Sequence, residues 1–275
     1  MKVFEVVVLF PFMGWIVKAT YMVVPGKDAT PEDEYELLYI GGGSILSPTT
    51  AVLDGIREIE HMGKIAIGNL KKGMDALCSL NEEEIDAVYH KEKYIDFMNR
   101  KITDYLVKVN EIELPIADAR LIGGLFHVVN DIERIGDHAE NVADSAVQMT
   151  NDNVTFSKQG ELDLSEMLDM VLKILDESIE MFAKNDLQHL QEIIDIENSI
   201  DQEERDLQQK HVERLTRNEC TPEAGMIFSD LVSGLERVAD HATNIAFSIL
   251  DEDPEEKAAR EAVAGAEKLR NGLRE

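Results

Sequence analysis

Two kinds of residue are scarce in this sequence, cysteine and the basic residues. The two cysteines, Cys78 and Cys220, form no CxxC pair, which argues against a zinc knuckle or a disulfide framework and favours a reducing cytoplasm. Lys and Arg together number 27 against 55 Asp and Glu, for a net charge of -28. Because nucleic-acid binding depends on cationic side chains that neutralise phosphates, no nucleic-acid partner is expected. Cations are the expected electrostatic partners.

Catalytic motifs and strand patterns are also missing. The sequence contains no glycine-rich phosphate loop, no HExxH motif and no hydroxyl nucleophile with a paired histidine, so we do not expect an enzyme. No run alternates between apolar and polar residues for more than a few positions, so no β-strand is predicted. Hydrophobic residues nonetheless make up 44% of the chain, which is enough for packed cores.

What the sequence does contain is a duplicated stretch, which we call the signature. Residues 133–143 read ERIGDHAENVA, and residues 236–246 read ERVADHATNIA. Seven of the eleven positions are identical, and the second copy begins 103 residues after the first. That spacing indicates duplication of a domain-sized unit rather than a short solenoid repeat.

Each signature fits one amphipathic helix. At about 100° per residue, Glu133 and Asp137 share a polar face, while Ile135, Ala139 and Val142 gather on the opposite face. The second copy repeats this division. We therefore expect the apolar side of each helix to enter a core and the carboxylate side to face away from it.

Start and stop signals predict six helices in two groups of three. The predicted helices span residues 48–80, 81–110, 115–153, 162–183, 186–217 and 221–250. The predicted fold class is all-α, with two tandem three-helix bundles preceded by an apolar N-terminal helix. The predicted parts, in chain order, are an apolar segment with its linker over 1–44, a first bundle over 45–153, a second bundle over 154–250 and a charged tail over 251–275.

The first part holds an apolar run over residues 3–24, in which only Glu5 and Lys18 are charged. Its length matches the roughly 20 apolar residues that cross a bilayer. Trp15 and Tyr21 suit an interfacial position. The run favours a membrane helix or the end of one; the alternative is a buried amphipathic helix packed on the rest of the protein.

Pairs of acids in the pattern ExxxD recur at matched places in the two halves. The pattern puts two carboxylates one turn apart on one helix face. Each half carries one pair on its middle helix and one in the signature, while the pairs 82/86 and 140/144 have no counterpart. The matched pairs, which we predict as metal ligands, are Glu92 with Asp96, Glu133 with Asp137, Glu197 with Asp201, and Glu236 with Asp240.

Two such faces on neighbouring antiparallel helices would bring four carboxylates to one patch. Oxygen ligands suit magnesium, manganese and ferric iron, and zinc also accepts carboxylates. The alternative is a solvated acidic face, because the like-charge pairs cost only about 1 to 2 kcal/mol in all. Arg134 and Arg237 are expected to pair with carboxylates, the alternative being to hold a phosphate. His138 and His241 are expected to hydrogen-bond between helices rather than to bind the metal.

The two signatures and the matched ExxxD pairs resemble those of the PhoU-domain family, over about residues 45–250. The resemblance implies six helices in two bundles, and surface clusters of several metal ions, with iron or zinc as the cofactor. It also implies regulation of phosphate uptake at the membrane, without enzyme activity. The implied metal ligands are Glu92, Asp96, Glu133 and Asp137 at one site, and Glu197, Asp201, Glu236 and Asp240 at the other.

Residues 9–28, LFPFMGWIVKATYMVVPGKD, and the helix that follows resemble the junction in bacterial sodium/phosphate cotransporters that end in a PhoU-like domain. The chain is accordingly expected to be the cytoplasmic C-terminal part of such a cotransporter, without the transport domain, at the cytoplasmic face of the cell membrane. A membrane phosphate transporter is the expected partner. The alternatives are a stand-alone PhoU-type regulator that also contacts a sensor kinase, and a carboxylate-bridged metalloprotein. Whether the chain forms a homodimer stays open.

Overall fold

The structure is a computed structural model that describes residues 35–41, 47–112 and 116–250. Chain contacts divide the protein into two units, residues 1–36 and 37–275, and every described helix belongs to the second. In chain order the helices are α3 (Pro48–Ser79), α4 (Glu82–Asn110), α5 (Ile116–Asp152), α6 (Lys158–Lys184), α7 (Leu190–Thr216) and α8 (Pro222–Phe247). The described ranges contain no strand, so the predicted all-α class is confirmed.

The predicted N-terminal apolar helix and the charged tail lie outside the described residues. Among the helices that the structure does describe, none has the length and apolarity needed to span a bilayer.

Polar caps fix where several helices begin. The side-chain oxygens of Ser47, Ser157 and Thr221 each accept a hydrogen bond from the amide three residues further on. Proline takes a place in the first turn of α3 and of α8, where its missing N–H costs nothing. Asn185, which adopts the left-handed conformation at φ 51°, ends α6.

The start of α7 differs from the prediction. The sequence predicts a start at Asp186, but the helix begins at Leu190. Asp186 Oδ1 accepts a hydrogen bond from the Gln188 amide at 3.0 Å. The Leu190 amide donates to the Leu187 carbonyl at 3.2 Å. Because Asp can satisfy nearby amides in a turn as well as at a helix cap, the cap signal was correct in kind but four residues early.

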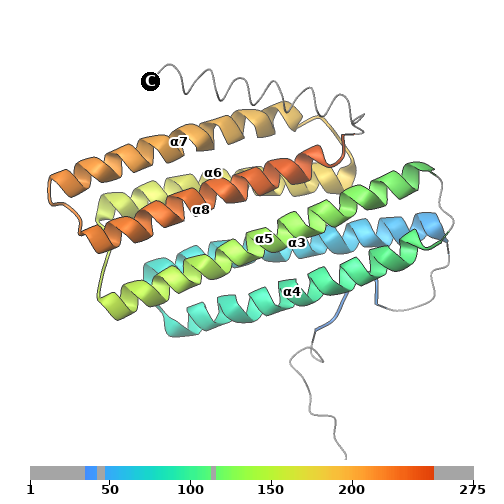
Figure 1. Cartoon of the computed structure of the whole chain (residues 1–275), viewed down its shortest axis with the longest axis horizontal. Helices are drawn as coiled ribbons and strands as arrows, with labels where there is room; N and C mark the ends of the chain where they lie inside the picture. The colour runs from blue at the N-terminus through green and yellow to red at the C-terminus, as the bar shows by residue number, and fades with distance from the viewer. Residues whose placement is uncertain (1–34, 42–46, 113–115, 251–275) are drawn as a thin grey trace, which may run out of the picture. The chain divides into compact units, whose positions relative to one another are not determined.

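The six helices form the two predicted three-helix bundles. Helices α3, α4 and α5 pack against one another, and so do α6, α7 and α8 (Figure 1). The bundles meet through α5 against α8 and α3 against α6, which leaves α4 and α7 on opposite outer sides (Figure 1). The middle and last helices, which carry the predicted acidic pairs, are therefore neighbours in each bundle.

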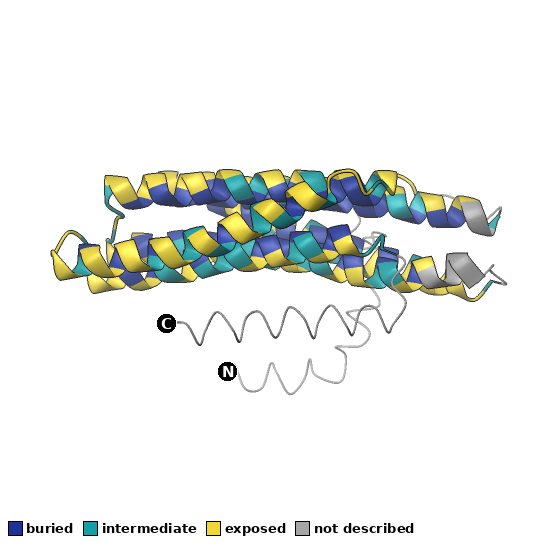
Figure 2. Ribbon diagram, turned by 90° about the horizontal axis from the view of Figure 1, so that it is seen from above, coloured by how far each residue is buried: buried dark blue, intermediate teal, exposed yellow. Residues whose placement is uncertain are grey.

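Each helix buries one face and exposes the other (Figure 2). In α5, Ile132, Ile135 and Ala139 are at most 1% exposed, and in α8 Val238 and Ala242 are fully buried. Each large apolar side chain removed from water in this way stabilises the fold by about 1.5 to 3 kcal/mol. The apolar faces predicted for the signature helices are thus the faces that form the core.

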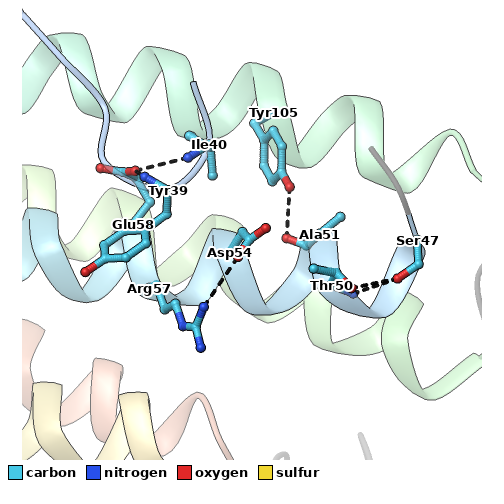
Figure 3. Close-up of polar contacts among 9 residues, drawn as sticks. All are labelled: Tyr39, Ile40, Ser47, Thr50, Ala51, Asp54, Arg57, Glu58 and Tyr105. Atoms are coloured by element: carbon cyan, nitrogen blue, oxygen red, sulfur yellow. Dashed lines mark hydrogen bonds and ion pairs between the residues drawn. The ribbon is translucent and has the colours of Figure 1, made fainter. Parts of the chain in front are cut away.

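A buried carboxylate fastens the chain ahead of α3 to that helix. Glu58 of α3 is fully buried. It accepts hydrogen bonds from the amides of Tyr39 and Ile40 at 2.6 and 3.3 Å (Figure 3). The amide of Leu38 donates to the same carboxylate at 3.3 Å. His61 Nδ1 lies 3.1 Å from the same carboxylate. Glu58 therefore acts as a structural anchor for this short segment.

Candidate functional site

The first acidic patch lies between α4 and α5, and we define it as Glu92, Asp96, Glu133, Asp137 and Glu140. Its register follows from the Tyr89 hydroxyl, which donates to Asp144 Oδ1 at 2.7 Å across the two antiparallel helices. Two turns further along each helix, Asp96 comes level with Asp137. The predicted pairs of this half therefore lie on facing parts of neighbouring helices.

Close packing of the two helices depends on Gly136. A Cβ atom at this position would lie 3.1 Å from Ile95 Cγ2 of α4, which is tighter than ordinary contact. Since Gly136 follows Glu133 by three residues and precedes Asp137 by one, the absence of a side chain here lets the acidic faces of α4 and α5 approach each other.

Glu92 is the most buried member of the first acidic patch, with 7% of its surface exposed. Burial is the main cause that raises its pKa to about 7. The negative charges of Asp96, Glu140 and Asp137 raise this pKa further. The carboxylates of both α4 and α5 therefore contribute to the electrostatic potential at Glu92.

Glu133 offers an unsatisfied oxygen. In the described part of the protein its Oε2 atom is buried and has no hydrogen-bond partner. Arg134 Nε approaches this atom only to 3.7 Å, while Arg134 Nη1 donates to Asp137 Oδ2 at 3.0 Å. The pKa of Glu133 is raised, chiefly by burial and then by Asp137. A buried acceptor without a donor is costly, and a cation would satisfy it.

The second acidic patch, which we define as Glu197, Asp201, Glu236 and Asp240, lies between α7 and α8. Ser233 Oγ donates to Glu204 Oε1 at 3.0 Å, which sets the register of the two helices. One turn further along each helix, Asp201 comes level with Glu236, and a turn beyond that Glu197 comes level with Asp240. The two halves thus place their matched pairs alike.

The carboxylates of both acidic patches are spaced more widely than a single ion requires. In the described part of the chain, only Glu177, His189 and Glu192 form a set of three Asp, Glu, His or Cys side chains with ligand atoms within 4.8 Å of one another. None of these three belongs to a predicted site. Among the described residues, therefore, neither acidic patch brings three carboxylate oxygens within reach of one ion.

The signature histidines lie at the interface between the bundles. His241 Nδ1 of α8 is 2.8 Å from Asp131 Oδ1 of α5, so the predicted inter-helix hydrogen bond is confirmed for His241. The rings of His138 and His241 are 6.1 Å apart. Burial, followed by the positive charges of His241 and Arg237, lowers the pKa of His138 to about 4. His138 is therefore neutral at physiological pH and contributes to packing between α5 and α8.

Glu140 is a member of the first acidic patch that the sequence did not predict as a ligand. Its pKa is raised by burial and by Asp144, Asp137 and Asp96, which places it among the same charges. The pair 140/144 is not duplicated, because the equivalent residues of the second copy are Thr243 and Phe247. The signal that could have found Glu140 is its position one turn after Asp137 on the same helix face.

Comparison with known proteins identifies the same two halves. The PhoU domain model matches residues 59–146 and 164–249, which fall on the two bundles. The chain is 25% identical over 194 residues to "Phosphate-specific transport system accessory protein PhoU homolog 1" of Thermotoga maritima, covering 70% of this chain and 83% of that protein. A PhoU homolog of Pseudomonas aeruginosa is 26% identical over 198 residues, covering 71% and 81%.

Solved structures show the same fold. The crystal structure of PhoU from Pseudomonas aeruginosa superposes with a TM-score of 0.67 at 25% identity, covering 73% of this chain and 96% of that one. The regulatory protein PhoU from Streptococcus pneumoniae gives a TM-score of 0.65 at 18% identity, covering 74% and 95%.

Proposed function

Because the chain belongs to the PhoU domain family, we propose that it regulates phosphate transport and does not catalyse a reaction. The observation that carries this proposal is the pair of family matches, one on each bundle. Its relatives in Thermotoga maritima and Pseudomonas aeruginosa are named as accessory proteins of phosphate-specific transport systems. The chain spans 83% and 81% of those two relatives, so the comparison covers most of each protein.

The two acidic patches are the proposed metal-binding sites. The buried, unpartnered Oε2 atom of Glu133 and the burial of Glu92 fit a bound cation better than a solvated acidic face. Iron or zinc ions, or less specifically magnesium or manganese, would supply the positive charge that offsets carboxylate repulsion. The carboxylates of α4 and α5, and those of α7 and α8, would then hold each helix pair in a fixed register for contact with a partner.

A more specific form of the proposal concerns location and partner. We propose that the chain works at the cytoplasmic face of the cell membrane, as the C-terminal part of a sodium-dependent phosphate cotransporter. The apolar run over residues 3–24 supports this form. The reading frame upstream of Met1 decides between this and a stand-alone regulator that contacts a transporter and a sensor kinase. Membrane spans in frame support the cotransporter, and a clean intergenic gap supports the regulator.

Phosphate uptake tests the general proposal. In a bacterium without its own PhoU-domain protein, expression of the chain should return the rate of radiolabelled phosphate uptake toward that of the parent strain. The double variant Asp137→Asn plus Asp240→Asn should fail to do so, since it removes one carboxylate charge from each acidic patch. Asp169→Asn in α6 is the matched control, because Asp169 is exposed and lies outside both patches. Equal uptake with and without the chain would contradict a regulatory role.

A further inference from the structure

A third group of possible ligands lies where α6 gives way to α7, away from both acidic patches. We call it the α6–α7 site and define it as Glu177, His189 and Glu192. Glu177 is in the last three turns of α6, His189 directly precedes α7, and Glu192 is in the first turn of α7. Each of the three offers one ligand atom, and these atoms all lie within 4.8 Å of one another.

The chemistry of these ligands suits zinc. One imidazole nitrogen and two carboxylate oxygens match the mixed ligand sets of zinc sites, whereas magnesium and calcium prefer oxygen alone. Tetrahedral zinc at bond lengths of about 2.0 to 2.2 Å holds its ligand atoms about 3.4 Å apart. The side chains of His189 and Glu192 are 50% and 47% exposed, and His189 Nδ1 already lies 3.5 Å from Glu192 Oε2. A fourth position would be left for water.

The positively charged side chain of Lys173 already pairs with this group. Lys173 Nζ lies 2.8 Å from Glu192 Oε1 and 3.6 Å from Glu177 Oε1, so it joins the two carboxylates across the helices. The ammonium does not satisfy the whole group, because Glu177 Oε2 is buried and has no hydrogen-bond partner in the described part of the protein. This oxygen belongs to a side chain that is 19% exposed, and a bound cation would give it the partner it lacks.

From this geometry we propose that Glu177, His189 and Glu192 form a zinc site that fastens the start of α7 to α6. The start of α7 has no side-chain cap from His189, so a zinc ion bound there would stabilise this end of the helix in place of a cap. The site faces α6, whereas the second acidic patch on α7 faces α8, because Glu192 and Glu197 are five residues apart and so about 140° apart around the helix. The site therefore does not depend on metal in the acidic patches.

Zinc titration of the purified full chain tests the proposal. The number of zinc ions bound and their affinity are measured by isothermal titration calorimetry and by competition with a chromophoric chelator. The background variant Asp137→Asn plus Asp240→Asn reduces binding at the acidic patches. In that background, His189→Ala and Glu177→Gln should each lose one zinc equivalent per chain. His127→Ala is the matched control, since His127 is exposed on α5 and should leave zinc binding unchanged.

Lys173→Met provides a second arm. The ammonium of Lys173 competes with zinc for Glu177 and Glu192, so its removal should tighten zinc binding. Circular dichroism establishes that each variant is folded, and Glu177→Gln keeps the test decisive if His189→Ala unfolds. The proposal is overturned if His189→Ala and Glu177→Gln bind as many zinc equivalents as the control, or if Lys173→Met leaves the zinc affinity unchanged. Either result would mean that the group is an ordinary surface salt-bridge network.

Discussion

At the scale of single residues, Glu92 predicts how the stability of the metal-free protein depends on pH. Its pKa is raised from 4.5 to about 7, so the folded protein binds this proton more tightly than the unfolded chain does. Protonation of Glu92 therefore stabilises the fold relative to the charged state. This contribution to the free energy of unfolding is fully present below pH 4.5 and is lost as pH rises through about 7. In the presence of a chelator, Glu92→Gln should therefore be more stable than the wild type at pH 8, by on the order of 2 kcal/mol.

Urea unfolding at pH 5 and pH 8 measures this difference, which should shrink at the lower pH. Asp104→Asn, an exposed position on the same helix, is the control and should show no such trend. A Glu92→Gln variant that is less stable than the wild type at pH 8 in the chelator would contradict the proposed repulsion among the carboxylates.

Glu58 gives a second prediction at this scale. Its two oxygens serve three backbone amides, so in Glu58→Gln the side-chain NH₂ must face at least one amide N–H. The expected loss is about 1.5 to 3 kcal/mol of unfolding free energy, with faster hydrogen exchange at the amides of residues 38–40. Glu60→Gln, which removes only an exposed pair with Lys64, should cost less than about 1 kcal/mol. Equal exchange in the two variants would show that Glu58 is not an anchor.

The sequence predicted some of these residues and not others, for physical reasons. The acids of the patches could be predicted because duplication placed ExxxD at matched positions, as in Glu133 and Glu236. Glu140 has no duplicate, and Glu58 gains its role only from a segment 18 to 20 residues away in the chain. The group around His189 was missed because its ligands come from two helices and the turn between them, and so share no spacing pattern.

At the scale of the helices, Gly136 predicts how closely α4 approaches α5. Gly136→Val would place new methyl groups beyond a Cβ that is already 3.1 Å from Ile95 Cγ2, so the helices must separate. We expect a loss of about 1 to 3 kcal/mol in thermal or urea unfolding, together with weaker metal binding at the first acidic patch. Gly123→Val on the same helix is the control, since a Cβ there meets nothing within 4 Å. Comparable losses in both variants would contradict the close approach.

Some helix starts followed local cap signals, but the predicted start of α6 at residue 162 was four residues late, because the Ser157 cap was not recognised. The predicted starts at residues 48 and 221 lie within one residue of the observed starts, where Ser47 and Thr221 cap helices that begin with proline. The α7 start was wrong because Asp186 bonds within a turn, which local sequence does not distinguish from a cap. Packing of α5 against α8 had no sequence signal of its own, since it joins residues about 110 positions apart, such as Asp131 and His241.

At the scale of the whole molecule, that packing predicts a single unfolding transition for the two bundles. Helices α3 and α5 bury part of their apolar faces against α6 and α8, and Asp131 pairs with His241 across the same interface. Neither bundle should therefore unfold while the other stays folded. Calorimetry of the metal-free full chain should give one peak whose calorimetric and van't Hoff enthalpies agree. Two separate peaks would show that the bundles are independent domains.

The central claim is that duplicated carboxylates on α4 with α5, and on α7 with α8, bind metal ions. Elemental analysis of the purified full chain tests it most directly, for the wild type and for the variant Asp137→Asn plus Asp240→Asn. The wild type should carry several iron or zinc ions per chain, and the double variant should lose them, apart from any zinc at the α6–α7 site. The same metal content in both proteins would contradict the claim.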